Sequence, residues 1–192
     1  MKYNNLPIYD VDFDDVVSTF NNVALVSAPA IEVNFVKMSQ DEEDIPIRMS
    51  LDEDKHIVTG PVLIPNQPIY RNQGGRRFYI RYSADTIEKM AINFFRNHRN
   101  TEGNVEHQFP VNGITYFESY LMNKERGIVP KEFADLPDGT WLMSAKINEE
   151  SVWNLIKEGE INGFSIDISN VGFKDKKEID SLEELLDYLT NN

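Results

Sequence analysis

Histidine, serine and carboxylate side chains are the groups in this sequence that suit a hydrolytic site. The chain has three histidines and no cysteine, so a hydrolase working near neutral pH without a thiol or a metal would need one histidine as its general base. His107 is the best placed, because NVEHQF predicts a strand in which Val105, His107 and Phe109 share one face. The same pattern also fits a structural histidine hydrogen-bonded within a sheet.

The other two histidines are less suited to catalysis. His98 follows an amphipathic helix, where a cation suits the helix dipole, and is expected at the surface. His56 begins the run HIVTG and is expected at an exposed strand end. The scattered positions match no metal-ligand spacing, so we expect neither a metal site nor a cofactor.

Ser165 is distinguished from the other serines by its setting. The run GFSID follows a predicted helix and a glycine-containing turn, where Gly163 can leave room for a substrate carbonyl near the backbone amides. Alternation along the predicted strand places Ser165 and Asp167 on one face and the apolar residues on the other. A serine on the solvent face of an ordinary strand is the alternative interpretation.

A serine and histidine pair usually needs a third group that orients the imidazole. Glu118, in the run ITYFESYL, is flanked by aromatic residues and would be costly to bury without a partner. His107 lies on the preceding strand of a predicted hairpin and is a natural partner. Asp167 is the rival third member, and a surface glutamate between tyrosines is the alternative for Glu118.

Composition excludes several classes of partner and compartment. A net charge of −13 opposes binding to nucleic acid and to anionic membranes. The absence of cysteine excludes disulfides and thiolate metal sites. The acidic start lacks a signal-peptide pattern and no apolar run reaches membrane-spanning length, so we expect a protein that stays in a cytoplasm.

Hydrophobic periodicity predicts strands interleaved with two helices. A helix over 84–98 is expected with Ser83 as its N-cap, and a shorter helix follows Asn148. A terminal helix is expected over 181–190. About seven strands are expected, and strands and helices do not alternate regularly as they would in βαβ units. The pattern therefore predicts an α+β domain or a decorated barrel.

Turn-forming residues and charged, polar stretches divide the chain into three regions. Residues 1–44 form an N-terminal segment and acidic linker, residues 45–173 form the main domain, and residues 174–192 form a polar linker and short helix.

Several segments in a fixed order resemble the phage prohead proteases of the XkdF type, which belong with the herpesvirus assemblin-like serine peptidases. The resemblance covers about residues 20–173. In chain order, the segments that carry it are HIVTGPVLIPNQPIYR, an amphipathic helix, VEH, FESYL, PKEFADLPDGTW and VWNLIKEGEINGFSI.

The resemblance implies a closed, antiparallel-rich β-barrel with peripheral helices and a serine endopeptidase. The family histidine falls on His107 and the nucleophile on Ser165. Herpesvirus relatives use a second histidine after the serine, and this chain has none there. Glu118 or Asp167 would therefore replace it, or the site would work as a dyad.

The implied function is capsid maturation in a tailed bacteriophage. The expected substrates are the scaffold protein, the extension of the major capsid protein and the protease itself, cleaved inside the prohead in the host cytoplasm. The portal and a second copy of the chain are further candidate partners. A catalytically inert scaffold or cargo protein with the same barrel is the alternative function, and a carboxylate-based hydrolase using Glu118 is another.

Overall fold

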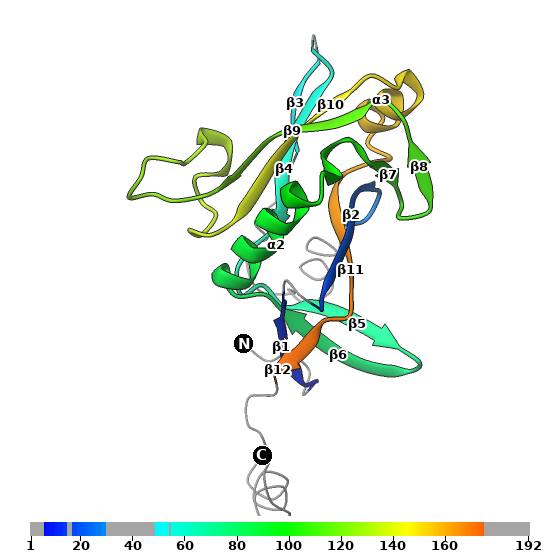
Figure 1. Cartoon of the computed structure of the whole chain (residues 1–192). Helices are drawn as coiled ribbons and strands as arrows, with labels where there is room; N and C mark the ends of the chain where they lie inside the picture. Colours follow the sequence, from blue (N-terminus) through cyan, green and yellow to red (C-terminus); the bar gives the residue numbers. More distant parts are fainter. Residues whose placement is uncertain (1–5, 15–16, 30–48, 54, 175–192) are drawn as a thin grey trace, which may run out of the picture.

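The computed structural model describes residues 6–14, 17–29, 49–53 and 55–174 (Figure 1). The predicted acidic linker at 39–46 and the predicted terminal helix at 181–190 lie outside these residues. The described part is mostly β-sheet with two α-helices. Among these residues, no helix is both long enough and apolar enough to cross a membrane.

The strands form three sheets of four strands each. The first has the order β12-β1-β6-β5, from Gly172–Lys174, Ile8–Asp12, Arg76–Arg81 and Ile69–Gln73. The second has the order β3-β4-β10-β9, from Ser50–Asp52, Ile57–Leu63, Trp141–Ile147 and Ile114–Leu121. The third has the order β11-β2-β7-β8, from Gly163–Ser169, Thr19–Val26, Gly103–Val105 and Phe109–Val111.

The prediction of one closed barrel is wrong, because the strands divide among three sheets and none of these sheets closes on itself. The two N-terminal strands explain much of this division. Strand β1 lies between β12 and β6, and β2 lies between β11 and β7. Both form one parallel and one antiparallel pairing, so two of the three sheets contain a strand from outside residues 45–173.

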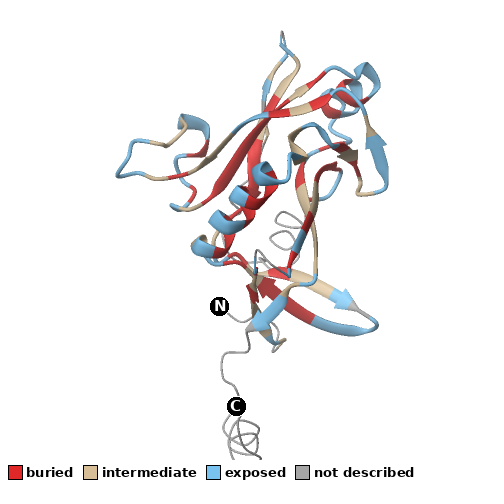
Figure 2. Ribbon diagram, in the orientation of Figure 1, coloured by how far each residue is buried: buried red, intermediate tan, exposed pale blue. Residues whose placement is uncertain are grey.

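Helix α2, Ala84–Arg96, packs its apolar face over the sheets, and Figure 2 shows buried residues along this contact. Its N-cap is Ser83, whose Oγ accepts a hydrogen bond from the Thr86 amide at 3.1 Å, as the sequence predicted. Phe94 lies in edge-to-face contact with Phe20 and Trp141, at centroid distances of 5.7 and 5.9 Å. This aromatic cluster joins the helix to the second and third sheets.

Tyr116 ties the second sheet to the third. Its hydroxyl donates to the carbonyl of Val23 at 2.8 Å, and its ring lies 6.2 Å from that of Phe164 on β11. Complete burial raises the pKa of Tyr116 well above its ordinary value, so the hydroxyl remains a donor. Because Phe164 is fixed in the core, its neighbour Ser165 points toward the opposite face of β11.

Helix α3, Glu150–Lys157, begins one residue later than predicted. Its N-cap is Glu149, whose carboxylate accepts from the Ser151 amide at 3.4 Å, and not Asn148. His56, expected at an exposed strand end, is only partly exposed because its ring stacks on Trp153 at 4.6 Å. Two short 3₁₀ turns, Arg99–Thr101 and Lys131–Phe133, complete the described elements.

The hairpin of β7 and β8 depends on a glycine at its first position. A Cβ on Gly103 would lie 2.5 Å from the Val111 carbonyl oxygen and 2.6 Å from the Ile114 Cβ. Gly103→Ala is therefore expected to lower the free energy of unfolding by about 1–3 kcal/mol, because a backbone atom cannot move aside cheaply. Urea denaturation followed by circular dichroism measures this loss.

Gly172→Ala is the matched control for that variant. Its added Cβ would lie 3.6 Å from the Asp12 Cβ, an ordinary van der Waals distance, so a change within about 0.5 kcal/mol is expected. Equal stability of the two variants would show that the hairpin tolerates the added methyl group.

Candidate active site

His107 lies in the turn between β7 and β8, and not in a strand as the sequence predicted. Glu106 and His107 both adopt left-handed backbone conformations, with φ of 56° and 55°. Such conformations cost of order 1 kcal/mol or more for residues other than glycine and are often found at functional sites. The predicted strand is wrong because the chain reverses at this turn, before Pro110 and Gly113.

Two contacts hold this strained turn against β2. The Glu106 amide donates to the Leu25 carbonyl at 2.9 Å, and the Glu106 carboxylate accepts from the Ser27 amide at 2.6 Å. Both partners belong to the end of β2 or the residue after it. The position of His107 is therefore fixed relative to β2.

The His107 ring is oriented by Asn22 on β2. Its Nδ1 lies 3.0 Å from the Asn22 Oδ1. An amide oxygen can only accept, so Nδ1 donates and carries the proton of the neutral imidazole. This tautomer leaves Nε2 without a proton and able to act as a base.

A β-bulge gathers polar side chains on β2 and β11. Asp167 pairs with Asn22, but the next residue of β11 pairs with Phe20, so Asn21 is the extra residue. Because a bulge turns side chains away from strict alternation, Asn21 reaches the same face and donates to Asp167 Oδ2 at 3.1 Å. Ser165 lies two residues before Asp167 and shares this face.

Burial and neighbouring charges set the protonation of His107. Burial lowers the pKa of His107 below its ordinary value of 6.5, and the positive charge of Arg71 lowers it further. The carboxylates of Asp167 and Glu106 oppose this effect, with Asp167 the larger of the two. The net shift is downward, so the imidazole is neutral at pH 7 and can accept a proton.

Ser165 is half-buried and pairs with Ala24 of β2. Its hydroxyl forms no hydrogen bond with His107 or with any other side chain that the structure describes. The predicted Ser165–His107 hydrogen bond is thus not formed in this state, in which Nδ1 of the ring is bonded to Asn22. Catalytic hydrogen bonds are often loose before substrate binds, so the pairing stays a prediction.

Glu118 is exposed on β9 of the second sheet, whereas His107 lies in the turn between two strands of the third sheet. Its Oε2 accepts from the Ser144 hydroxyl at 2.6 Å, and that hydroxyl is 2.8 Å from the Thr59 hydroxyl. The hairpin that was expected to join Glu118 to His107 is absent, because β7 pairs with β8 while β9 pairs with β10. Of the two predicted third members, only Asp167 acts on the His107 ring in this structure.

Gly163 has a packing role in the fold. A Cβ at this position would lie 2.4 Å from the Cγ of Pro29, which is buried. Pro29 therefore occupies space that the sequence interpretation had left open for a substrate carbonyl.

Sequence reasoning missed Asn21 and Asn22. The run FNNVALV contains two adjacent asparagines within β2, and asparagine is depleted in strands. That depletion was the available signal that this part of the strand has a special role. No group of three or more histidine, cysteine or acidic residues that could hold a metal occurs among the described residues.

The site thus contains an oriented neutral histidine, a serine and an aspartate, which are the residue types that a serine hydrolase uses. Residues 44–172, about two thirds of the chain, match the family described as "Putative phage serine protease XkdF". The chain belongs to this family of phage serine proteases. The match includes His107, Ser165 and Asp167, whereas Asn22 precedes it. Comparisons with curated proteins and with solved structures gave no match.

Proposed function

We propose that this protein is the serine endopeptidase that matures the capsid of a tailed phage, with Ser165 as nucleophile and His107 as general base. One observation carries the assignment of residues: Asn22 orients a neutral imidazole beside the face of β11 that bears Ser165 and Asp167. The family supplies the reaction class.

The proposed reaction is acyl transfer. Nε2 of His107 takes the proton of the Ser165 hydroxyl while the oxygen attacks the peptide carbonyl carbon, which forms a tetrahedral oxyanion. The imidazolium then gives this proton to the leaving amine as the C–N bond breaks. Water, activated by the same nitrogen, releases the acyl group and restores the serine.

The role of the third member is divided between two residues in this proposal. Asn22 accepts from Nδ1–H and fixes the tautomer of His107. The Asp167 carboxylate stabilises the imidazolium through its charge and is itself held by Asn21. An amide in the orienting role has a precedent in the cysteine, histidine and asparagine arrangement of other proteases.

The proposed setting is the prohead in the host cytoplasm, with no cofactor. The scaffold protein, the major capsid protein and the chain itself are the proposed substrates, with the portal and a second copy of the chain as candidate partners. The phage family supports this setting, and the net charge of −13 argues against nucleic acid as a partner. We also propose kinship with the herpesvirus assemblin-like peptidases, based on the order of the sequence segments.

Labelling with a fluorophosphonate probe tests the serine mechanism without any knowledge of the substrate. Such probes react with a serine hydroxyl only where a base activates it. We expect a mass increase on the peptide that contains Ser165 when the folded protein is labelled. The same peptide should show no mass increase when the protein is denatured before the probe is added. Absence of label from the folded protein, with and without its own scaffold protein, would contradict the proposal.

The alternative is an inert capsid component that kept the fold and lost activity. The missing hydrogen bond between Ser165 and His107 is the observation that favours it. The two functions differ in the labelling experiment, because an inert protein would leave Ser165 unmodified.

The pH dependence of cleavage should report the environment of His107. Because the pKa of His107 is lowered, kcat/KM should fall only as the pH drops through a value below 6.5. Removing a carboxylate that favours the imidazolium lowers this pKa further, so Asp167→Asn should shift the acid limb to lower pH. Initial rates on a peptide from the scaffold cleavage site, measured from pH 4.5 to 8, give this limb.

Asp135→Asn is the control, because this carboxylate is exposed and is not among the groups that act on His107. It should leave the acid limb unchanged. A limb that moves upward in the Asp167 variant would contradict the proposed role of this charge.

A further inference from the structure

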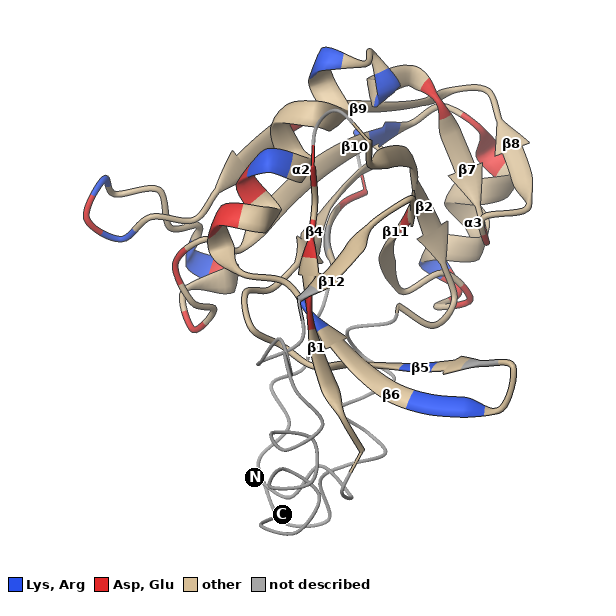
Figure 3. Cartoon of the chain, turned by 60° about the horizontal axis from the view of Figure 1, so that its bottom comes forward, with Lys and Arg blue, Asp and Glu red and all other residues tan. Residues whose placement is uncertain are grey.

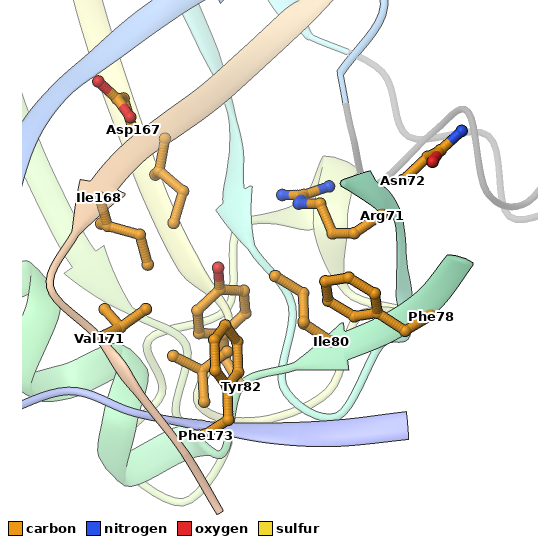
Figure 4. A pocket seen from close by; sticks show the side chains of 11 residues that line it. Arg71, Asn72, Phe78, Ile80, Tyr82, Asp167, Ile168, Val171 and Phe173 are labelled. Atoms are coloured by element: carbon orange, nitrogen blue, oxygen red, sulfur yellow. The ribbon is translucent and has the colours of Figure 1, made fainter. Parts of the chain in front are cut away.

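A pocket of about 370 Å³ lies between β11 and the hairpin of β5 and β6 (Figure 4). Its wall is mostly apolar and includes Ile166, Ile168, Phe78 and Phe173. The size falls at the lower end of the range for sites that bind small ligands. The pocket is therefore large enough for a side chain of a bound peptide.

The pocket adjoins the candidate active site through β11. Ile166 follows Ser165 directly and Asp167 also lines the pocket. Asp167 and Arg71, both in the lining, are also two of the three residues whose charges act on the His107 imidazole. Because β11 is the edge strand of its sheet, a peptide with its scissile bond at Ser165 could cross this edge and place a neighbouring side chain in the pocket.

Arg71 is a largely buried cation without a carboxylate partner among the described residues. Its Nη1 donates to the Tyr70 carbonyl at 3.0 Å, and its guanidinium interacts electrostatically with the Tyr82 hydroxyl. By contrast, Arg81 on the same hairpin is paired with Asp10. A guanidinium removed from water without a counter-charge favours the binding of an anion, and it matches a carboxylate with two parallel hydrogen bonds.

Neighbouring groups in the pocket leave Arg71 available for such an anion. Burial lowers the pKa of Arg71, and the interaction with the Tyr82 hydroxyl opposes this effect. Burial also raises the pKa of Tyr82 to about 12, so its hydroxyl stays protonated and can donate. Asp167 lies on the opposite side of the pocket from Arg71 in Figure 4 and is bonded to Asn21.

The hairpin that forms one wall of the pocket is basic within an acidic protein. Residues 69–81 contain four arginines and no acidic residue, whereas the whole chain has a net charge of −13. Figure 3 shows the basic positions on β5 and β6. Such a local positive potential attracts an acidic segment of a partner.

We propose that this pocket binds an acidic side chain, glutamate or aspartate, next to the scissile bond of a peptide substrate, with Arg71 as the residue that recognises the carboxylate. The apolar wall contacts the methylene groups of that side chain. This specificity rests on the proposed protease function, but its binding step does not require catalysis.

Binding to the full-length Ser165→Ala protein tests the pocket separately from cleavage. The probes are the blocked peptides acetyl-Ala-Glu-Ala-amide and acetyl-Ala-Gln-Ala-amide, titrated while NMR signals of Arg71 and Tyr82 are followed. We expect the glutamate peptide to bind at least about tenfold more tightly. Equal binding of the two peptides, or binding of neither, would overturn the proposal even if Ser165 is the nucleophile.

A charge variant and a matched control test whether Arg71 causes the preference for the glutamate peptide. Arg71→Gln in the Ser165→Ala background should remove the preference for glutamate. Arg77→Gln should keep it, because Arg77 is exposed on the same hairpin and does not line the pocket. A preference that persists in the Arg71 variant would overturn the assignment. If that variant does not fold, the comparison of the two peptides on the parent protein still decides.

Discussion

Ser165→Ala is expected to reduce cleavage of the scaffold protein by roughly 10³-fold or more, because the variant loses the atom that attacks the peptide bond. The variant should fold normally. Ser165 is half-buried and forms no side-chain hydrogen bond with the described residues, so its loss should change the free energy of unfolding by no more than about 0.5 kcal/mol. A gel of scaffold co-expressed with each protease variant measures the cleavage.

Ser169→Ala is the matched control for the nucleophile. Ser169 is a half-buried serine on the same strand, and its hydroxyl accepts from Asn21 at 3.4 Å. This variant should cleave at nearly the wild-type rate. Unchanged cleavage by Ser165→Ala would eliminate the serine mechanism and would favour a hydrolase based on Glu118. No cleavage by the wild type inside its own prohead would favour the inert capsid component.

The secondary structure could be predicted where the signal is local. The period of the apolar residues and the cap at Ser83 gave α2 almost to its ends, because both depend on residues within one helix. The pairing of strands could not be predicted in this way. Leu25 of β2 pairs with Val105 of β7, and nothing in either short segment identifies a partner so distant in sequence. The closed barrel was inferred without this pairing and was wrong.

The candidate site shows the same division between local and distant information. Alternation along β11 correctly separated Ser165 from the core residue Phe164. The turn at Glu106 and His107 was missed because neither residue is a glycine or asparagine, the types that usually indicate a left-handed conformation. The contact of Asn22 with His107 joins residues from separate strands. The bulge that turns Asn21 toward Asp167 is also a property of two strands, because it arises only in the pairing of β2 with β11.

His107→Asn is expected to reduce cleavage nearly as much as the loss of Ser165, by roughly 10²-fold to 10⁴-fold, because the serine then has no base to accept its proton. Asparagine is chosen because it tolerates the left-handed conformation at this position, where φ is 55°. Alanine would add backbone strain and confuse a fall in activity with a loss of folding. Cleavage of co-expressed scaffold and thermal unfolding should be measured on the same preparations.

His98→Asn is the control for that variant, because His98 is also left-handed, with φ of 56°, but is exposed at the end of α2. It should leave cleavage unchanged.

The double variant Ser165→Ala with His107→Asn should be no less active than Ser165→Ala alone, since the two residues act as one unit and their losses do not add. Asn22→Ala should cause a smaller loss than His107→Asn, because it removes the orientation of the base and leaves the base present. Additive losses in the double variant would mean that His107 acts on a step separate from Ser165, and the proposed pairing would then be wrong.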